Sequence, residues 1–203
     1  MTRQQLNRFF NTLSKEYHGP VRVILTGAAA GSITGPLRPS LDVDFGVELP
    51  RRTASRWQAL TEAIERTVRL TGIPAQYAED IDRWGAISLL DYRTHATRYQ
   101  RFGDVRVDVL DPAYWSIGKL TRYLDPDVFD LVKVFTRTRV PVLQVARLWG
   151  RALKISPRST ACTQFRAHVE HFLQTYGRRI WGAPFDSSHA IAVFRRAAGI
   201  REG

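Results

Sequence analysis

The spacing of apolar residues changes from helical to alternating within the first fifty positions. Apolar residues recur at helical spacing near the start of the chain: Leu6, Phe9, Phe10 and Leu13. Thr2 precedes them as a cap, so an amphipathic helix is expected there. Residues 21–26, VRVILT, form a short β-rich run that stops at Gly27, and the small residues after it suit a helix start. Residues 41–49 alternate between apolar and polar, which predicts a second strand.

Further elements follow the same rules up to about residue 136. Helical spacing of apolar residues predicts a crossover helix over residues 52–71, ended by Gly72 as its cap. Two more strands are expected at residues 86–92 and 105–110, with the polar, basic segment 93–104 as their connection. Asp-Pro pairs at 111–112 and 125–126 are each expected to open a helix.

From Val140 onward the apolar spacing is helical throughout. Trp149, Phe165 and Phe172 fall on these helices as expected core residues. The sequence therefore predicts an α+β protein whose α/β-like front half contains a mixed sheet and whose C-terminal region is all helical. The expected domains are residues 1–136 and residues 137–203, the second packed on the first.

The composition predicts a soluble, cytoplasmic protein. Of 203 residues, 44% are hydrophobic, which is enough for a core. No apolar run approaches the roughly 20 residues of a membrane span, and the first residues lack the apolar stretch of a signal peptide. Cys162 is the one cysteine, so no internal disulfide is expected and a small core or surface role suffices for it.

The net charge of +11 is concentrated in the last third of the chain. Residues 137–203 hold 12 Lys and Arg against 3 Asp and Glu. Phosphate neutralisation supplies most sequence-independent affinity for nucleic acids, so this block indicates a polyanionic partner such as RNA or DNA. The alternative is that these residues only solvate the outer faces of helices.

Asp42 and Asp44 are the first candidates for a chemical role. Side chains alternate along a strand, so both carboxylates project to one face, while Leu41, Val43 and Phe45 project to the other. Two adjacent carboxylates repel each other unless a hard cation neutralises them. The pair therefore predicts a site for Mg²⁺ or Mn²⁺.

Residues 27–44, GAAAGSITGPLRPSLDVD, resemble a segment of the nucleotidyltransferase superfamily that includes DNA polymerase beta. The AbiE-type toxin nucleotidyltransferases are still closer, with a glycine turn after the first strand and then Arg-x-Ser-x-Asp-x-Asp. The resemblance implies nucleotide-binding roles for Gly27, Ala28, Arg38 and Ser40. Ala28 departs from the family, which has a second glycine there. Antitoxin-type minimal nucleotidyltransferases instead have Gly-Ser shortly before the aspartates, and an alternative alignment would place that motif on residues 31–32.

The resemblance also implies a third metal-binding carboxylate on a neighbouring strand. Asp108 is the candidate, because it lies inside the β-rich run 105–110, where a buried aspartate needs a metal or another partner. Asp104 and Asp111 lie at the ends of this run, and a turn and a helix cap account for them.

Residues 119–130, KLTRYLDPDVFD, resemble the family's Lys-Leu-x-Arg followed by two aspartates three residues apart. By this resemblance Lys119 would contact the triphosphate of the nucleotide. Asp127 and Asp130 share a helix face, where they would orient Lys119 or Arg122, or stand as exposed acids of a first helical turn.

The function expected from these motifs is transfer of a nucleoside monophosphate from a nucleoside triphosphate to a hydroxyl group. RNA is the expected acceptor, with tRNA the specific candidate, and the resemblance to toxins implies a toxin-antitoxin system with a cognate antitoxin. Three alternatives stay open: a protein acceptor, a small-molecule acceptor, and a catalytically idle module that binds RNA or regulates.

Two weaker candidates complete the set. His168 and His171 are three residues apart on one expected helix, without the spacing of a known zinc motif. In the expected loop 93–104, His95 is accompanied by basic and aromatic residues, as in single-stranded RNA contacts, although a solvated loop explains them equally well.

Overall fold

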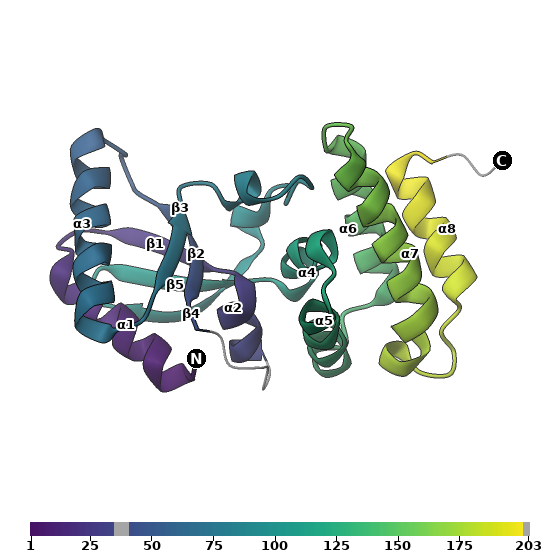
Figure 1. Ribbon diagram of the computed structural model, residues 1–203, viewed down its shortest axis with the longest axis horizontal. Helices are drawn as coiled ribbons and strands as arrows, with labels where there is room; N and C mark the ends of the chain where they lie inside the picture. Colours follow the sequence, from purple (N-terminus) through teal and green to yellow (C-terminus); the bar gives the residue numbers. More distant parts are fainter. Residues whose placement is uncertain (35–40, 201–203) are drawn as a thin grey trace. The chain divides into compact units, whose positions relative to one another are not determined.

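The computed structural model describes residues 1–34 and 41–200 and has an α+β fold (Figure 1). In the described residues a five-stranded mixed sheet accompanies eight α-helices and two short 3₁₀ helices. The expected α+β class is confirmed. None of the described helices combines the length and the hydrophobicity that a membrane span requires.

The contacts divide the chain into two compact units. The first contains Met1–Ile81 and Arg93–Asp111, and the second contains Asp82–Tyr92 and Pro112–Gly203. Helices α4 (Pro112–Arg122) and α5 (Asp125–Thr138) belong to the second unit, because they pack against its later helices. The expected domains, residues 1–136 and 137–203, place α4 and most of α5 in the first domain.

The sheet of the first unit has the strand order β3-β2-β1-β5-β4. The bounds of its strands are β1 Val21–Leu25, β2 Val43–Glu48, β3 Ala75–Ala78, β4 Ala96–Phe102 and β5 Val105–Leu110. Strand β1 pairs antiparallel with β2 and parallel with β5. Strands β2 and β3 are parallel, and α3 (Ala54–Thr71) joins them as the expected crossover helix, with Gly72 as its left-handed cap.

One face of this sheet forms the apolar core of the first unit. Helix α1 (Arg3–Glu16) starts at Thr2, whose hydroxyl accepts from the Gln5 N–H in a capping box. Phe10 of α1 lies 5.9 Å from the Phe45 ring and 6.1 Å from the Phe102 ring, between centroids. Helices α1 and α3 lie together on this side of the sheet (Figure 1). The other face carries the polar side chains.

Two expectations about strands were wrong. Residues 86–92 form no strand, because side chains satisfy their backbone: the Leu89 N–H donates to a carboxylate oxygen of Asp82, and the Leu90 N–H donates to Ser88 Oγ at 3.0 Å. Residues 93–104 contain edge strand β4 rather than only a connection.

The second unit is a helical core made by α4, α5 and three later helices, α6 (Val142–Ile155), α7 (Thr160–Trp181) and α8 (Ser187–Ala198). Phe135, Trp149 and Phe172 form ring contacts within it, and Trp149 Nε1 donates to Ser116 Oγ at 2.8 Å. Trp149, Phe165 and Phe172 are fully buried, as expected. A Cβ added at Gly150 would lie 2.5 Å from the Phe194 carbonyl oxygen, so α6 passes close to α8 there.

Candidate functional site

The glycine turn after β1 lies directly against the second aspartate of the pair. Helix α2 (Gly27–Thr34) begins at Gly27, which has φ +60°. A Cβ added at Gly27 would lie 1.8 Å from Asp44 Oδ2 and 2.8 Å from Asp44 Cβ. The Thr26 N–H also donates to the Asp44 carbonyl oxygen at 2.9 Å. Only glycine fits this position, and its missing side chain lets the Asp44 carboxylate reach the amino end of α2.

The amino end of α2 has the polarity of an anion site. The helix dipole places partial positive charge at this end, which favours a negatively charged group there. Ala28, where the family resemblance has glycine, is buried in the first turn. Gly31 is also buried and lies inside the helix, so Gly27 is the glycine at the turn.

Asp42 and Asp44 project to the same side of the sheet, as expected. Gln76 of β3 pairs with Asp44 of β2, so both side chains lie on one face. The Gln76 amide donates to Asp42 Oδ2 at 3.1 Å, which brings Asp42 to that face as well. Arg38 and Ser40, the other two polar residues of this motif, lie outside the described residues.

Asp108 lies on β5 with its carboxylate fully buried between two arginines. Arg22 Nε donates to Asp108 Oδ2 at 2.7 Å, and Arg106 Nε donates to Asp108 Oδ1 at 2.9 Å. Arg22 also donates to Glu48 Oε2 at 2.9 Å. Burial acts to lower the pKa of Arg22, but its hydrogen bonds to Asp108 and Glu48 outweigh burial and raise it. We call Asp108, Arg22, Arg106 and Glu48 the arginine-bound network.

The strand register separates Asp108 from Asp44. Ile24 is opposite Asp108 on one side and opposite Gly46 on the other, so Asp44 lies two strands away and two residues further along. Strand spacing and rise then place the two Cα atoms about 12 Å apart. Among the described residues, no group of three or more His, Cys, Asp and Glu side chains is arranged to hold a metal ion. The structure thus brings Asp42 and Asp44 together and gives Asp108 other partners.

Lys119 lies on α4 of the second unit with its ammonium group buried. Its Nζ donates to Asp127 Oδ1 at 2.9 Å and to Asp130 Oδ2 at 2.8 Å, and it lies 5.4 Å from the centre of the Trp115 ring. Arg122 donates to the same Asp127 oxygen at 2.7 Å. We call Lys119, Asp127, Asp130 and Arg122 the lysine-bound network.

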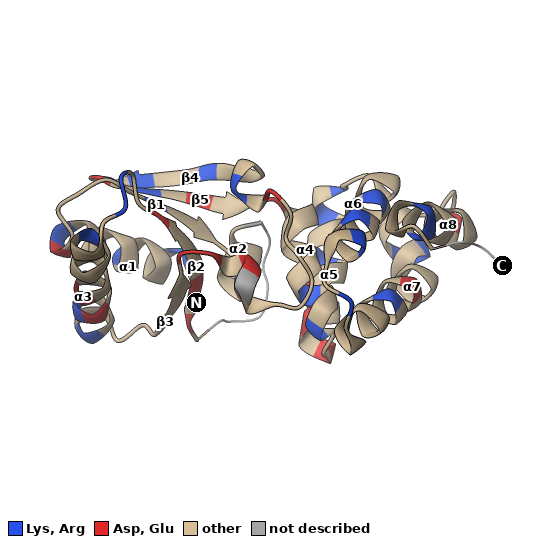
Figure 2. Ribbon diagram, turned by 90° about the horizontal axis from the view of Figure 1, so that it is seen from above, with Lys and Arg blue, Asp and Glu red and all other residues tan. Residues whose placement is uncertain are grey.

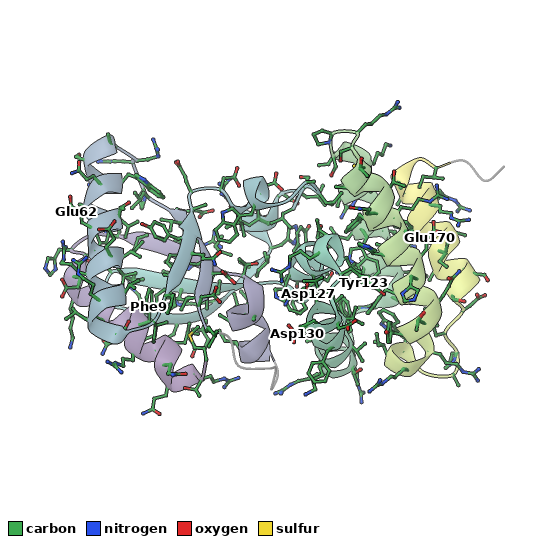
Figure 3. All side chains as sticks on the ribbon, in the orientation of Figure 1. Phe9, Glu62, Tyr123, Asp127, Asp130 and Glu170 are labelled. Carbon is green, nitrogen blue, oxygen red and sulfur yellow. The ribbon has the colours of Figure 1, made fainter. Side chains whose placement is uncertain are left out.

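The two aspartates of α5 therefore orient Lys119 and are not exposed acids. Figure 3 labels both of them. Burial acts to raise the pKa of the Asp127 carboxyl, and the hydrogen bonds from Arg122 and Lys119 outweigh it, so the pKa lies below its ordinary value. The two carboxylates balance the charges of Lys119 and Arg122 together.

The two histidines of α7 both contact Tyr123 and do not form a pair with each other. The Tyr123 ring stacks on His168 at 4.7 Å, and its hydroxyl group is 2.8 Å from His171 Nδ1. His168 Nδ1 donates to the Leu120 carbonyl oxygen at 2.8 Å. Burial raises the pKa of the Tyr123 hydroxyl. Tyr123 and His168 are thus held by contacts with α4 and α7.

The expected RNA-contact loop is partly strand. Arg98, Tyr99 and Arg101 lie on edge strand β4, and His95 precedes it in an exposed position. The Tyr99 hydroxyl donates to Asn7 Oδ1 at 2.8 Å, which fixes its ring against α1. Of this group, the two arginines and His95 remain at the surface.

Sequence reasoning missed Arg22 and Gln76. Arg22 had a detectable signal, since a charged residue in the apolar strand VRVIL needs a buried partner of opposite sign, and Asp108 in VRVDVL needs one too. Gln76 had none, because β3 is only four residues long.

Comparison of the chain with protein-family models, with curated proteins and with solved structures gives no match. The assignment of a function therefore rests on the residues, their geometry and the motif resemblance.

Proposed function

We propose that the first unit is a metal-dependent nucleotidyltransferase domain of the DNA polymerase beta type. The observation that carries the proposal is the contact between Gly27 and Asp44, with Asp42 on the same face of the sheet. This contact joins the two halves of the motif that resembles the AbiE-type enzymes, the glycine turn and the paired aspartates. A mixed sheet with the turn after β1, Asp44 near the start of β2 and Asp42 just before that strand supports the same assignment.

The donor set at this place fits a hard divalent cation. Asp42 and Asp44 offer carboxylate oxygens, the ligands that Mg²⁺ and Mn²⁺ prefer. A metal ion held there would supply charge neutralisation for a nucleoside triphosphate and activation of an acceptor hydroxyl group. The amino end of α2 at Gly27 and Ala28 would orient a phosphate through its backbone N–H groups.

The proposed acceptor is RNA, with tRNA as its specific candidate. Nine basic side chains of residues 137–200 are exposed and have no ion pair with the described residues: Arg137, Arg139, Arg147, Arg151, Lys154, Arg158, Arg178, Arg179 and Arg196. Cations that no acid of the described residues neutralises favour a polyanion. A toxin with a cognate antitoxin is the setting that the motif resemblance favours.

A second candidate function is a catalytically idle nucleotidyltransferase module that binds RNA. The arginine-bound network favours it, because both Asp108 oxygens already accept from guanidinium groups. In this alternative Asp108 stabilises the sheet and no third metal ligand is required.

Transfer of label separates the two candidates. The protein is incubated with Mg²⁺ or Mn²⁺, each α-³²P-labelled nucleoside triphosphate and total RNA, beside Asp44→Asn. Asp104→Asn is the matched control, since Asp104 is an exposed aspartate of the same unit. Label in RNA with wild type and control, and none with Asp44→Asn, supports the enzyme.

Other outcomes identify the alternatives. Label in a protein or in a small molecule identifies a different acceptor. Wild-type protein that is folded, binds RNA and transfers nothing with any nucleotide supports the idle module and overturns the enzymatic proposal.

A further inference from the structure

The exposed face of α6 carries a row of three basic side chains. Arg147, Arg151 and Lys154 follow one another at intervals of four and three residues, which places them on one side of the helix. All three are exposed, whereas Val145, Leu148 and other residues of the helix are buried in the core of the unit. Blue positions recur along α6 in Figure 2.

Within residues 1–34 and 41–200, no acidic side chain offsets this basic row. Helix α6 contains no Asp or Glu, and neither does α8, which packs beside it. No described residue forms an ion pair with any of the three. Two other arginines of the unit are paired, because Glu170 of α7 accepts from Arg166 and from Arg195 at 2.9 and 2.8 Å. Like charges at this spacing destabilise a helix slightly, so the basic row is a cost to the free protein.

We propose that the basic row of α6 binds the phosphate backbone of the RNA acceptor. This inference takes the identity of the partner from the proposed function, but it concerns binding and needs no chemistry. At a rise of about 1.5 Å per residue, the row extends over about 10 Å, which is long enough to face several successive phosphates. An anionic backbone neutralises all three charges at once.

The same row suits a protein partner less well. Protein interfaces have an apolar, well-packed centre with charges at the rim. Between Arg147 and Lys154 the exposed side of α6 is cationic: Leu148 and Trp149 are buried and Leu153 is half-buried, while the exposed Ile155 lies beyond the end of the row. Charge without an apolar centre is typical of backbone binding to nucleic acids.

The test measures binding of fluorescein-labelled bulk tRNA by anisotropy, without metal ion or nucleotide, between 50 and 200 mM salt. In the variant Arg147→Ala/Arg151→Ala/Lys154→Ala, we expect affinity to fall about 10- to 100-fold at 150 mM salt. The slope of log affinity against log salt should decrease by about 2 to 3, because three phosphate contacts are lost. Circular dichroism and thermal unfolding check that the variant is folded.

The matched control removes the same charge from other helices of the unit: Arg137→Ala/Arg178→Ala/Arg179→Ala. It should lose less affinity and less of the salt slope than the α6 variant does, because its three cations do not form one row on one helix. Equal loss in both variants would mean that net charge alone attracts RNA, and wild-type affinity in the α6 variant would mean that the row makes no contact. Either result overturns the proposal.

A competition arm tests the partner class. Polyglutamate that displaces labelled tRNA as well as unlabelled tRNA does, at equal charge, would overturn phosphate recognition and favour an acidic protein. Asp44→Asn separates this inference from the proposed function, since it should bind tRNA like wild type. If tRNA binding depends on the basic row but no nucleotide is transferred, only the enzymatic proposal is rejected. If nucleotide is transferred to RNA but the α6 variant binds tRNA normally, only the proposal about the basic row is rejected.

Discussion

The two buried ion networks of this protein are built in opposite ways. In the first unit one carboxylate, Asp108, accepts from two guanidinium groups, while in the second unit one ammonium group, Lys119, donates to two carboxylates. Each central group is almost fully buried. The outer groups differ: Arg22 and Arg106 are partly exposed, whereas Asp127 and Asp130 are as buried as Lys119.

This difference predicts how each network responds when the charge of its central group, Asp108 or Lys119, is removed. Exposed guanidinium groups can turn to water when their carboxylate is removed. Buried carboxylates cannot, so they would remain desolvated and repel each other. The lysine-bound network should therefore be the more sensitive of the two.

The largest effect is expected for Lys119→Met, which keeps the length of the side chain and removes its charge. The variant should lose about 3–5 kcal/mol of unfolding free energy, because two buried carboxylates lose their main partner. Urea unfolding followed by circular dichroism measures it. Lys133→Met, at an exposed position of α5, is the control and should change stability by less than about 1 kcal/mol. A stable Lys119→Met that loses only nucleotide binding would show that phosphate contact, not structure, is the role of this lysine.

The second-largest loss of stability is expected for Gly27→Ala, which acts on Asp44. The new Cβ would displace the Asp44 side chain and also occupy a backbone with positive φ, at a cost of about 2–4 kcal/mol. Gly72→Ala is the matched control, since Gly72 has φ +68° but no atom within 4 Å of an added Cβ. Its cost should be about 1–2 kcal/mol. The difference between the two variants, in unfolding free energy and in label transfer, measures the effect of displacing Asp44. Equal values for the two variants would contradict a role of this contact.

Asp108→Asn should destabilise the protein by about 1–3 kcal/mol, less than Lys119→Met. The amide keeps the shape of the side chain, and the guanidinium groups can still donate hydrogen bonds to water or, for Arg22, to Glu48. The comparison depends on this order. If Asp108→Asn is stable but abolishes transfer, Asp108 belongs to the chemistry. If Asp108→Asn destabilises the protein as much as Lys119→Met does, solvation of the exposed arginines does not reduce the loss of stability.

The smallest effect is a pH dependence of the lysine-bound network. The folded pKa of Asp127 lies below its ordinary value of 3.8, so its contribution to stability is present above that value. Stability is lost as the pH falls through the lower folded pKa, that is, below about pH 4. Urea unfolding at pH 3 to 7 should show this loss in wild type and a weaker one in Asp127→Asn. The exposed Asp125→Asn is the control and should resemble wild type.

Strong apolar periodicity made much of the fold predictable. Phe9, Phe10 and Leu13 identify α1, and the run before Gly27 identifies β1. Edge strands escaped prediction because their side chains lack a buried face: the four residues of β3 are only partly buried, and β4 has a register shift between Arg98 and Gln100 that interrupts its alternation.

The candidate site was predictable where its partners are close in sequence. Asp42 directly precedes the strand that carries Asp44, and Lys119 lies within eleven residues of both its aspartates. Asp108 was predicted to need a partner or a metal; of its two partners Arg106 is two residues away, but Arg22 is 86 residues away. Strand register decides such a pairing, and a single sequence does not contain the register.

The close approach of α6 to α8 at Gly150 has a consequence for binding entropy. Gly150 lies between Arg147 and Arg151 in the sequence, where a side chain would strike the Phe194 carbonyl oxygen and the Ala197 methyl group. The backbone that carries the basic row is thus fixed by its neighbour before any partner arrives. A rigid row loses only side-chain freedom when it meets a phosphate backbone, so less of the attraction is spent on ordering the protein.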